Sequence, residues 1–135
     1  LPAEGATAQG VLSYYNYATA TDSPDNKRFV EAYRKRFKSE PGVFSFGGYV
    51  AARAVIEAAK VNKGDFSDTG RFLTALKAVQ FDGPAGKFHF DAYQNAVIHL
   101  FIRRVQPGAG GQLVNAPIDV IKDVEQYWPK GKPAK

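Results

Sequence analysis

The sequence of 135 residues contains no cysteine and no methionine, and only two histidines and one tryptophan. The absence of cysteine excludes disulfide frameworks, cysteine-ligated zinc or iron–sulfur sites and thiol nucleophiles. Because the chain begins with Leu1 and has no methionine, we expect that it was cut from a longer precursor. The longest mostly apolar run, residues 96–105, has about half of the ~20 residues that a transmembrane helix requires, and it carries His99 and two arginines. We therefore expect no membrane-spanning segment.

The composition that remains is that of one packed domain. Apolar residues make up 44% of the chain, aromatic residues 13% and charged residues 23%, which excludes a wholly disordered or collagen-like polymer. Lysine and arginine outnumber aspartate and glutamate by 18 to 13, so the net charge is +5. A chain of this length is expected to form a single unit with its own core.

The first part of the chain predicts one strand followed by a helix. Residues 3–9 are small and typical of a linker, and the aromatic, β-prone residues 10–17 predict a strand. Residues 22–25 supply a capping side chain, a proline and an acid, which together predict a helix start. Pro41 and Gly42 are expected to end this helix.

The expected helix has an apolar stripe and a basic remainder. The stripe consists of Phe29, Val30, Tyr33 and Phe37, at helical spacing. The basic cluster, residues 34–38, falls in the last turns of the helix, where cations complement the helix dipole. We therefore interpret the basic cluster as solvated helix surface, with a nucleic-acid footprint as the alternative.

Two more helices are expected, at residues 45–62 and from residues 67–68 onward. In the first, one face is formed by Tyr49, Ala52, Ile56 and Ala59. In the second, the residues expected to be buried are Phe72, Leu73, Leu76 and Val79.

The rest of the chain is rich in turns and β-prone residues. Residues 81–86 predict a turn, residues 87–90 alternate, and residues 91–95 turn back into the apolar run 96–105. Residues 112–114 follow another turn, and residues 118–128 are ambiguous between a strand and a short helix. One strand, three helices and then several strands do not make the alternation of a self-contained parallel sheet. We therefore expect the first strand to find its neighbours outside this chain.

Neither catalysis nor metal binding is indicated. His89 and His99 stand on separate expected strands, without an acidic cluster that would complete a metal site. No serine lies in a Gly-x-Ser-x-Gly turn, and the glycine-rich turns lack the Lys-Ser/Thr of a phosphate loop. Asp82 and Asp91 flank the expected hairpin and are more typical of turns than of an acid–base pair. We expect no enzyme, no metal site and no cofactor.

Several short motifs follow one another in a characteristic order. They are GVLS at residues 10–13, DSPDNKRFVEAY at 22–33, EPG at 40–42, GYVAA at 48–52, FLTAL at 72–76 and FDGPAGKFHFD at 81–91. In this order and spacing, over nearly the whole chain, they resemble the C-terminal part of type I periplasmic substrate-binding proteins, the branched-chain amino acid receptors of ABC importers.

The resemblance implies an α/β fold of two lobes that close on a small ligand by hinge bending, with this chain as the C-terminal fragment. Residues 1–18 would be a linker and a second-lobe strand, residues 19–98 the helices and hairpin of the first lobe, and residues 99–135 the return to the second lobe with its tail. The neighbours of the first strand would then lie in the missing N-terminal part of the same protein.

The resemblance also implies ligand-binding residues. The family places an aromatic side chain just ahead of the Gly-Tyr-x-Ala-Ala helix, and Phe46 stands three residues before Tyr49. Phe46 is therefore the first candidate, and Phe44, which shares strand-like parity with it, is the second; Tyr14 and Tyr17 are candidates near the hinge. The polar groups that anchor a ligand lie, in the family, mostly in the missing part, and no acid here is a convincing partner for an amino group. Amino acids and organic or aromatic acids both stay open as ligands.

The implied function is that of a periplasmic, non-enzymatic solute-binding component, which delivers its ligand to an ABC permease at the inner membrane. The basic cluster is a candidate surface for docking on that permease. One alternative is a ligand-sensing receptor of the same fold; another is a small basic domain that binds nucleic acid, which predicts steep salt dependence of binding. We expect the isolated chain to self-associate through apolar faces that the missing part would cover.

Overall fold

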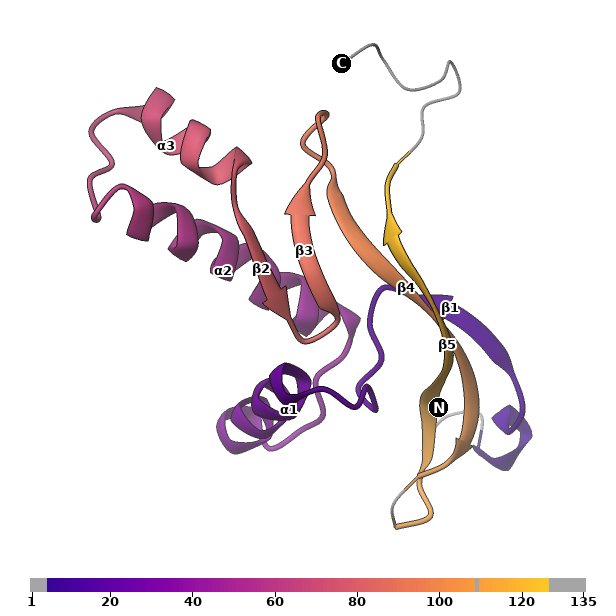
Figure 1. The fold of residues 1–135 in the computed structure, drawn as a ribbon. Coiled ribbons are helices and arrows are strands. Elements are labelled where there is room, and N and C mark those ends of the chain that lie inside the picture. The colour runs from indigo at the N-terminus through magenta and orange to yellow at the C-terminus, as the bar shows by residue number, and fades with distance from the viewer. Residues whose placement is uncertain (1–4, 109, 127–135) are drawn as a thin grey trace.

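A computed structural model describes residues 5–108 and 110–126. The chain forms η1 (Gly5–Ala8), β1 (Leu12–Tyr15), α1 (Pro24–Phe37), α2 (Val43–Val61), α3 (Thr69–Lys77), β2 (Gln80–Gly83), β3 (Gly86–Phe90), β4 (Ala96–Pro107) and β5 (Leu113–Val124). The mixed α/β architecture, the three successive helices and the antiparallel pair β3–β4 confirm the expectations from the sequence. The expected turn at residues 81–86 is corrected, because residues 80–83 form the strand β2, which pairs with β3 in a hairpin. The three helices and the hairpin lie on one side of the molecule, and β1, β5 and the C-terminal half of β4 lie on the other (Figure 1).

Helix α1 is bounded by capping groups at both ends. The Ser23 hydroxyl accepts a hydrogen bond from the Asn26 main-chain N–H at 3.1 Å, and Pro24 takes the first helical position. Lys38, in the left-handed conformation, closes the helix by donating its N–H to the Arg34 carbonyl. The expected stripe is buried only in part, because Phe37 at the end of the helix lies beyond the core and is 59% exposed.

Helix α2 buries a different face from the one that the sequence suggested. The buried residues are Phe46, Val50, Ala54 and Ala58. Tyr49 and Ile56, on the expected face, are exposed. The buried residues and the residues of the expected face both recur at helical intervals. Because both of these faces are apolar, the pattern does not reveal which of them packs. In α3, likewise, Phe72 and Leu76 are half-buried, but Leu73 is exposed.

Strand β1 has a neighbour within this chain, which corrects the expectation that its neighbours lie outside. It pairs antiparallel with β4, with Leu12 opposite Arg104 and Tyr15 opposite Phe101. The pairing arises because β4 is long and its C-terminal half runs past the hairpin. Strand β5 also pairs with β4, so the ambiguous C-terminal segment is a strand as far as Val124. Part of the expected linker at residues 3–9 is the short helix η1, and residues 3, 4, 127 and 128 lie outside the described residues.

The core lies where α1 and α2 meet the hairpin and β4. Its larger members are Tyr17, Phe29, Val30, Phe46, Val50, Val79, Phe88 and Phe101. These side chains come from helices, strands and the stretches between β1 and α1 and between α3 and β2, so the core joins elements that lie far apart in the sequence.

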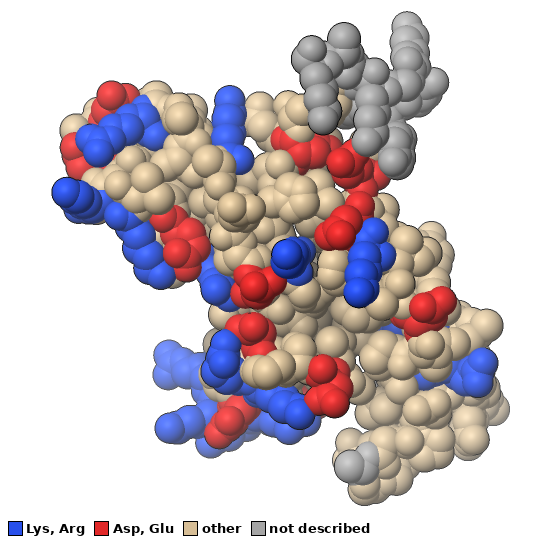
Figure 2. Space-filling view, in the orientation of Figure 1, with Lys and Arg blue, Asp and Glu red and all other residues tan. Residues whose placement is uncertain are grey.

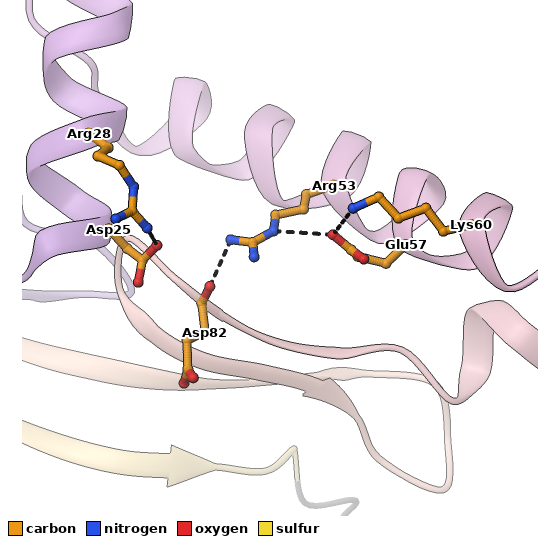
Figure 3. A network of polar contacts seen from close by, with 6 residues as sticks. All are labelled: Asp25, Arg28, Arg53, Glu57, Lys60 and Asp82. Atoms are coloured by element: carbon orange, nitrogen blue, oxygen red, sulfur yellow. Dashed lines mark hydrogen bonds and ion pairs between the residues drawn. The ribbon is translucent and has the colours of Figure 1, made fainter.

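Arg53 joins α2 to the outer strand of the hairpin (Figure 3). Its guanidinium lies 4.4 Å from the centre of the Phe81 ring and donates a hydrogen bond of 2.7 Å to the main-chain carbonyl of Asp82. Its Nε faces the Glu57 carboxylate at 3.7 Å, and Lys60 approaches the same carboxylate at 3.0 Å. The main-chain carbonyl of Asp82, on the edge strand β2, therefore has a hydrogen-bond partner and is covered by the Arg53 side chain.

Candidate functional site

Residues 16–22 link β1 to α1, and we call them the connecting segment. Tyr17, in this segment, is only 1% exposed. Its ring is stacked on Phe46 with centroids 4.8 Å apart and meets Phe29 edge-on at 6.0 Å. Its hydroxyl donates a hydrogen bond of 3.0 Å to Oδ1 of Asn26. Tyr17 therefore fixes the connecting segment to both α1 and α2.

Asn26, in the first turn of α1, holds the same segment by its amide group. It is 1% exposed, and its Nδ2 donates to the main-chain carbonyls of Thr19 and Thr21, each at 2.8 Å. With the Tyr17 hydroxyl bound to its Oδ1, both ends of the Asn26 amide have partners. The network is thus a fully paired buried polar cluster of the kind that specifies one local conformation.

Arg103, on β4, reaches the connecting segment from the other side. Its Nη1 donates to the Tyr17 carbonyl at 3.0 Å and its Nη2 to the Ser13 hydroxyl at 3.2 Å. The guanidinium also lies 5.4 Å from the centre of the Tyr15 ring, and its Nε is buried without a hydrogen-bond partner. Burial lowers the pKa of Arg103, because both of its acceptors are neutral groups that compensate little for lost water.

The burial of Tyr17 leads to a prediction about pH. Burial raises the pKa of its hydroxyl from 10.0 to about 12. Since a tyrosine in the unfolded chain ionises near pH 10, the stability gained from neutral Tyr17 is complete below pH 10 and is lost as the pH rises toward 12. The full shift in pKa corresponds to a loss of about 3 kcal/mol in the free energy of unfolding. Ultraviolet titration should show a late phenolate step that Tyr17→Phe abolishes; identical titration curves for the two proteins would contradict this assignment.

The structure places the four aromatic candidates for ligand binding in different surroundings. Tyr17 and Phe46 lie together in the core, whereas Phe44 is 90% exposed and Tyr14 is 71% exposed. The expected strand-like parity of Phe44 and Phe46 is wrong, because α2 begins at Val43 and residues two apart on a helix point about 200° from each other. Contact with a ligand stays a prediction for all four.

Two residues of this region, Asn26 and Arg103, were not singled out from the sequence. Asn26 directly follows the capping residues 22–25, and a polar residue in the first turn of a helix gives no special signal. Arg103 offered a weak signal, since a charged residue interrupts an apolar strand. Its partners Tyr17 and Ser13 are 86 and 90 residues away, so only the folded chain reveals the contact.

Two of the other candidate groups, Asp91 and His99, have structural partners. Asp91 accepts hydrogen bonds from the N–H groups of Tyr93 and Asn95, as a turn aspartate does. His99 accepts one from the Asp123 N–H at 3.1 Å. Among residues 5–108 and 110–126, no group of three or more histidines and acids is arranged to hold a metal ion. Within the same part of the chain, no helix combines the length and the apolar character needed to cross a membrane.

Positive charge gathers over α1 (Figure 2). The last turn carries Arg34, Lys35 and Arg36, as the sequence predicted. Arg34 makes a forked ion pair with Glu40, at 2.6 and 3.0 Å, and acidic side chains lie among the cations in this view. The basic cluster is therefore a mixed, partly paired surface.

Comparison with known proteins identifies the family. A family model described as "Periplasmic binding protein" matches residues 1–112. An ABC transporter substrate-binding protein from Sphaerobacter thermophilus is 35% identical, with a TM-score of 0.87 over 90% of this chain and 33% of that chain. A solute-binding protein of an ABC transporter from Rhodopseudomonas palustris, in complex with 3,4-dihydroxybenzoic acid, is 32% identical, with a TM-score of 0.83 and the same coverage. Leu/Ile/Val-binding protein homolog 6 of Brucella abortus is 29% identical over 98% of this chain and 33% of its own length.

The chain belongs to the periplasmic binding protein family, and its neighbours are type I binding proteins of ABC transporters. It spans about a third of the length of the relatives that it matches. Those relatives are substrate-binding proteins of transporters rather than enzymes.

Proposed function

We propose that this chain is part of the solute-binding component of an ABC importer. The protein is exported to the periplasm, closes around a small organic ligand and delivers it to a permease in the inner membrane. The observation that carries this proposal is the family match over residues 1–112. The basic cluster on α1 remains the candidate surface for docking on the permease.

The arrangement of the elements supports a division into two lobes. We assign residues 19–98 to the first lobe and residues 1–18 and 99–135 to the second. The helices and hairpin lie on one side of the molecule, and the sheet of β1, β5 and the C-terminal half of β4 lies on the other (Figure 1). Tyr17 and Phe101 connect the two parts, because both belong to the core formed with α1, α2 and the hairpin. Two stretches of chain pass between these parts, the connecting segment and β4, and these are the places where hinge bending would occur.

Phe44 is the side chain that we place against the ligand. It lies in the first turn of α2, two residues from Phe46, which is anchored on Tyr17 in the core. A phenylalanine ring that is 90% exposed gains free energy when another surface covers it, at about 25 cal/mol per Å². Tyr14, exposed on β1, is the second contact that we propose. Phe46 and Tyr17 remain proposed ligand contacts, and their rings are stacked on each other in the core.

The ligand that we propose is a small organic acid, with aromatic acids tested first. An exposed aromatic ring suits a planar ligand, and a net charge of +5 suits an anion. The Rhodopseudomonas relative was solved with 3,4-dihydroxybenzoic acid, and the Brucella relative is named for leucine, isoleucine and valine. These compounds share a carboxylate, so titrating the complete protein with 3,4-dihydroxybenzoate and with leucine distinguishes the two classes.

Replacement of Phe44 by alanine is expected to weaken binding of the preferred ligand about 10- to 100-fold, since each tenfold loss corresponds to about 1.4 kcal/mol. Isothermal titration calorimetry on the complete protein measures this effect. Phe37→Ala is the matched control, because Phe37 is also an exposed phenylalanine on a helix and is not placed at the site. Equal affinity of Phe44→Ala and the unmodified protein would remove Phe44 from the site, and no binding of either compound would reject the proposed ligand class.

A further inference from the structure

We propose that Arg103 and Asn26 form a clamp on Tyr17 that restricts the orientation of the two lobes before ligand binds. Both are positioning residues, because they act on the hinge and not on the ligand. The inference rests on the proposed function, since it concerns the closure of the two lobes.

The first half of the clamp is made by Arg103. Its guanidinium contacts three alternate residues of the neighbouring stretch: the Ser13 hydroxyl, the Tyr15 ring and the Tyr17 carbonyl. Residues 13–17 are thereby fixed to β4, the second stretch of chain that passes between the proposed lobes. A partly buried guanidinium with two neutral acceptors and an unpaired, buried Nε is a poor means of stabilising a fold. Because burying Arg103 in this way costs free energy, we infer that its side chain has a role other than stabilising the fold.

The second half is made by Asn26, on the first-lobe helix α1. It binds the Tyr17 hydroxyl and the carbonyls of Thr19 and Thr21. Tyr17 is therefore held at two ends, with its carbonyl attached to β4 and its hydroxyl attached to α1. Relative rotation of the lobes at the connecting segment has to strain or break one of these two attachments.

This arrangement is expected to affect binding through preorganisation. A hinge that samples few orientations loses little conformational entropy when the lobes close on a ligand. Removal of the clamp is expected to widen the range of lobe orientations in the ligand-free protein. Ligand then has to order a looser hinge, so the affinity falls.

Pulsed electron–electron double resonance, which measures the distance between two spin labels, tests the clamp in the complete protein. Spin labels at Lys77→Cys on α3 and Lys122→Cys on β5, both exposed positions, report the distance between the proposed lobes. Arg103→Gln is expected to broaden the ligand-free distance distribution and to raise the dissociation constant for 3,4-dihydroxybenzoate or leucine about 10-fold. Arg103→Lys, which retains a donor, should restore part of both effects. Arg104→Gln is the matched control, because Arg104 is the exposed next residue of the same strand.

The results for these variants distinguish a clamp on the hinge from a role of Arg103 in stability alone. An unfolding temperature lowered by Arg103→Gln, with unchanged distance width and affinity, would overturn the proposal. Tyr17→Phe removes the bond to Asn26 and leaves the Tyr17 carbonyl in place, so it is expected to broaden the distribution even where Arg103→Gln fails to fold. Failure of the unmodified protein to bind or close on either compound would reject the proposed function, whereas the ligand-free distance widths would still decide on the clamp.

Discussion

Replacement of Asn26 by alanine is expected to lower the free energy of unfolding by about 3 to 4 kcal/mol, a large share of the stability of an ordinary domain. The amide of Asn26 is 1% exposed and makes three hydrogen bonds, to Tyr17, Thr19 and Thr21. Alanine leaves the Thr19 carbonyl and the Tyr17 hydroxyl without their Asn26 partner, whereas the Thr21 carbonyl keeps the hydrogen bond from the Ser23 N–H. Each such group costs about 1–3 kcal/mol, and partial access of water to the new space reduces the total.

Urea unfolding of the complete protein, followed by circular dichroism, measures this loss. Glu31→Ala is the control, because Glu31 is an exposed residue of the same helix. Asn26→Asp keeps the size of the side chain and the acceptor for Tyr17 but removes both donors to the threonine carbonyls. It is therefore expected to destabilise the protein about as much as alanine does. A loss below about 1 kcal/mol in both variants would show that the network does not hold the connecting segment.

Local signals in the sequence were sufficient for much of the fold. Ser23 and Pro24 predicted the start of α1, and the turn at residues 91–95 predicted that β3 returns into β4. These features depend on residues within a few positions of one another. Hydrogen bonds and backbone preferences at that range can be derived from residue type alone.

Two features of the fold depend on distant residues and were missed. The sequence does not encode locally that β1 lies beside β4, because residues 12 and 104 meet only after the helices and the hairpin have formed between them. The buried face of α2 depends on what packs against it, and both of its long faces are apolar. Patterning specifies a buried face only where the opposite face is polar.

The candidate site was predictable at the level of region but not of individual side chains. The resemblance to binding proteins pointed to the aromatic residues around the connecting segment and the start of α2. A difference of two residues in the start of that helix then separated Phe44, which is exposed, from Phe46, which is in the core. Asn26 and Arg103 act through hydrogen bonds to main-chain carbonyls, and such contacts leave no pattern of residue types in the sequence.

Replacement of Gly86 by alanine is expected to cost about 3 kcal/mol, for two separate reasons. Gly86 has a φ of 101°, which a residue with a Cβ adopts only with strain. A Cβ at this position would also stand 2.5 Å from Nε2 of His99, and His99 can move away only by giving up its hydrogen bond from the Asp123 N–H. Gly83, its partner across the hairpin, has no such conflict, since the nearest atom to a Cβ there is 3.5 Å away.

Gly83→Ala is therefore the matched control for Gly86→Ala and is expected to change the stability by less than about 1 kcal/mol in the same urea experiment. Adding His99→Ala to the Gly86→Ala protein removes the steric conflict while the backbone strain remains. The effect of Gly86→Ala, measured against His99→Ala alone, should then fall to about 1–2 kcal/mol. Equal stability of the two glycine variants would mean that the hairpin adjusts freely around His99, and that the attachment of β5 to β4 through His99 and Asp123 does not depend on the turn.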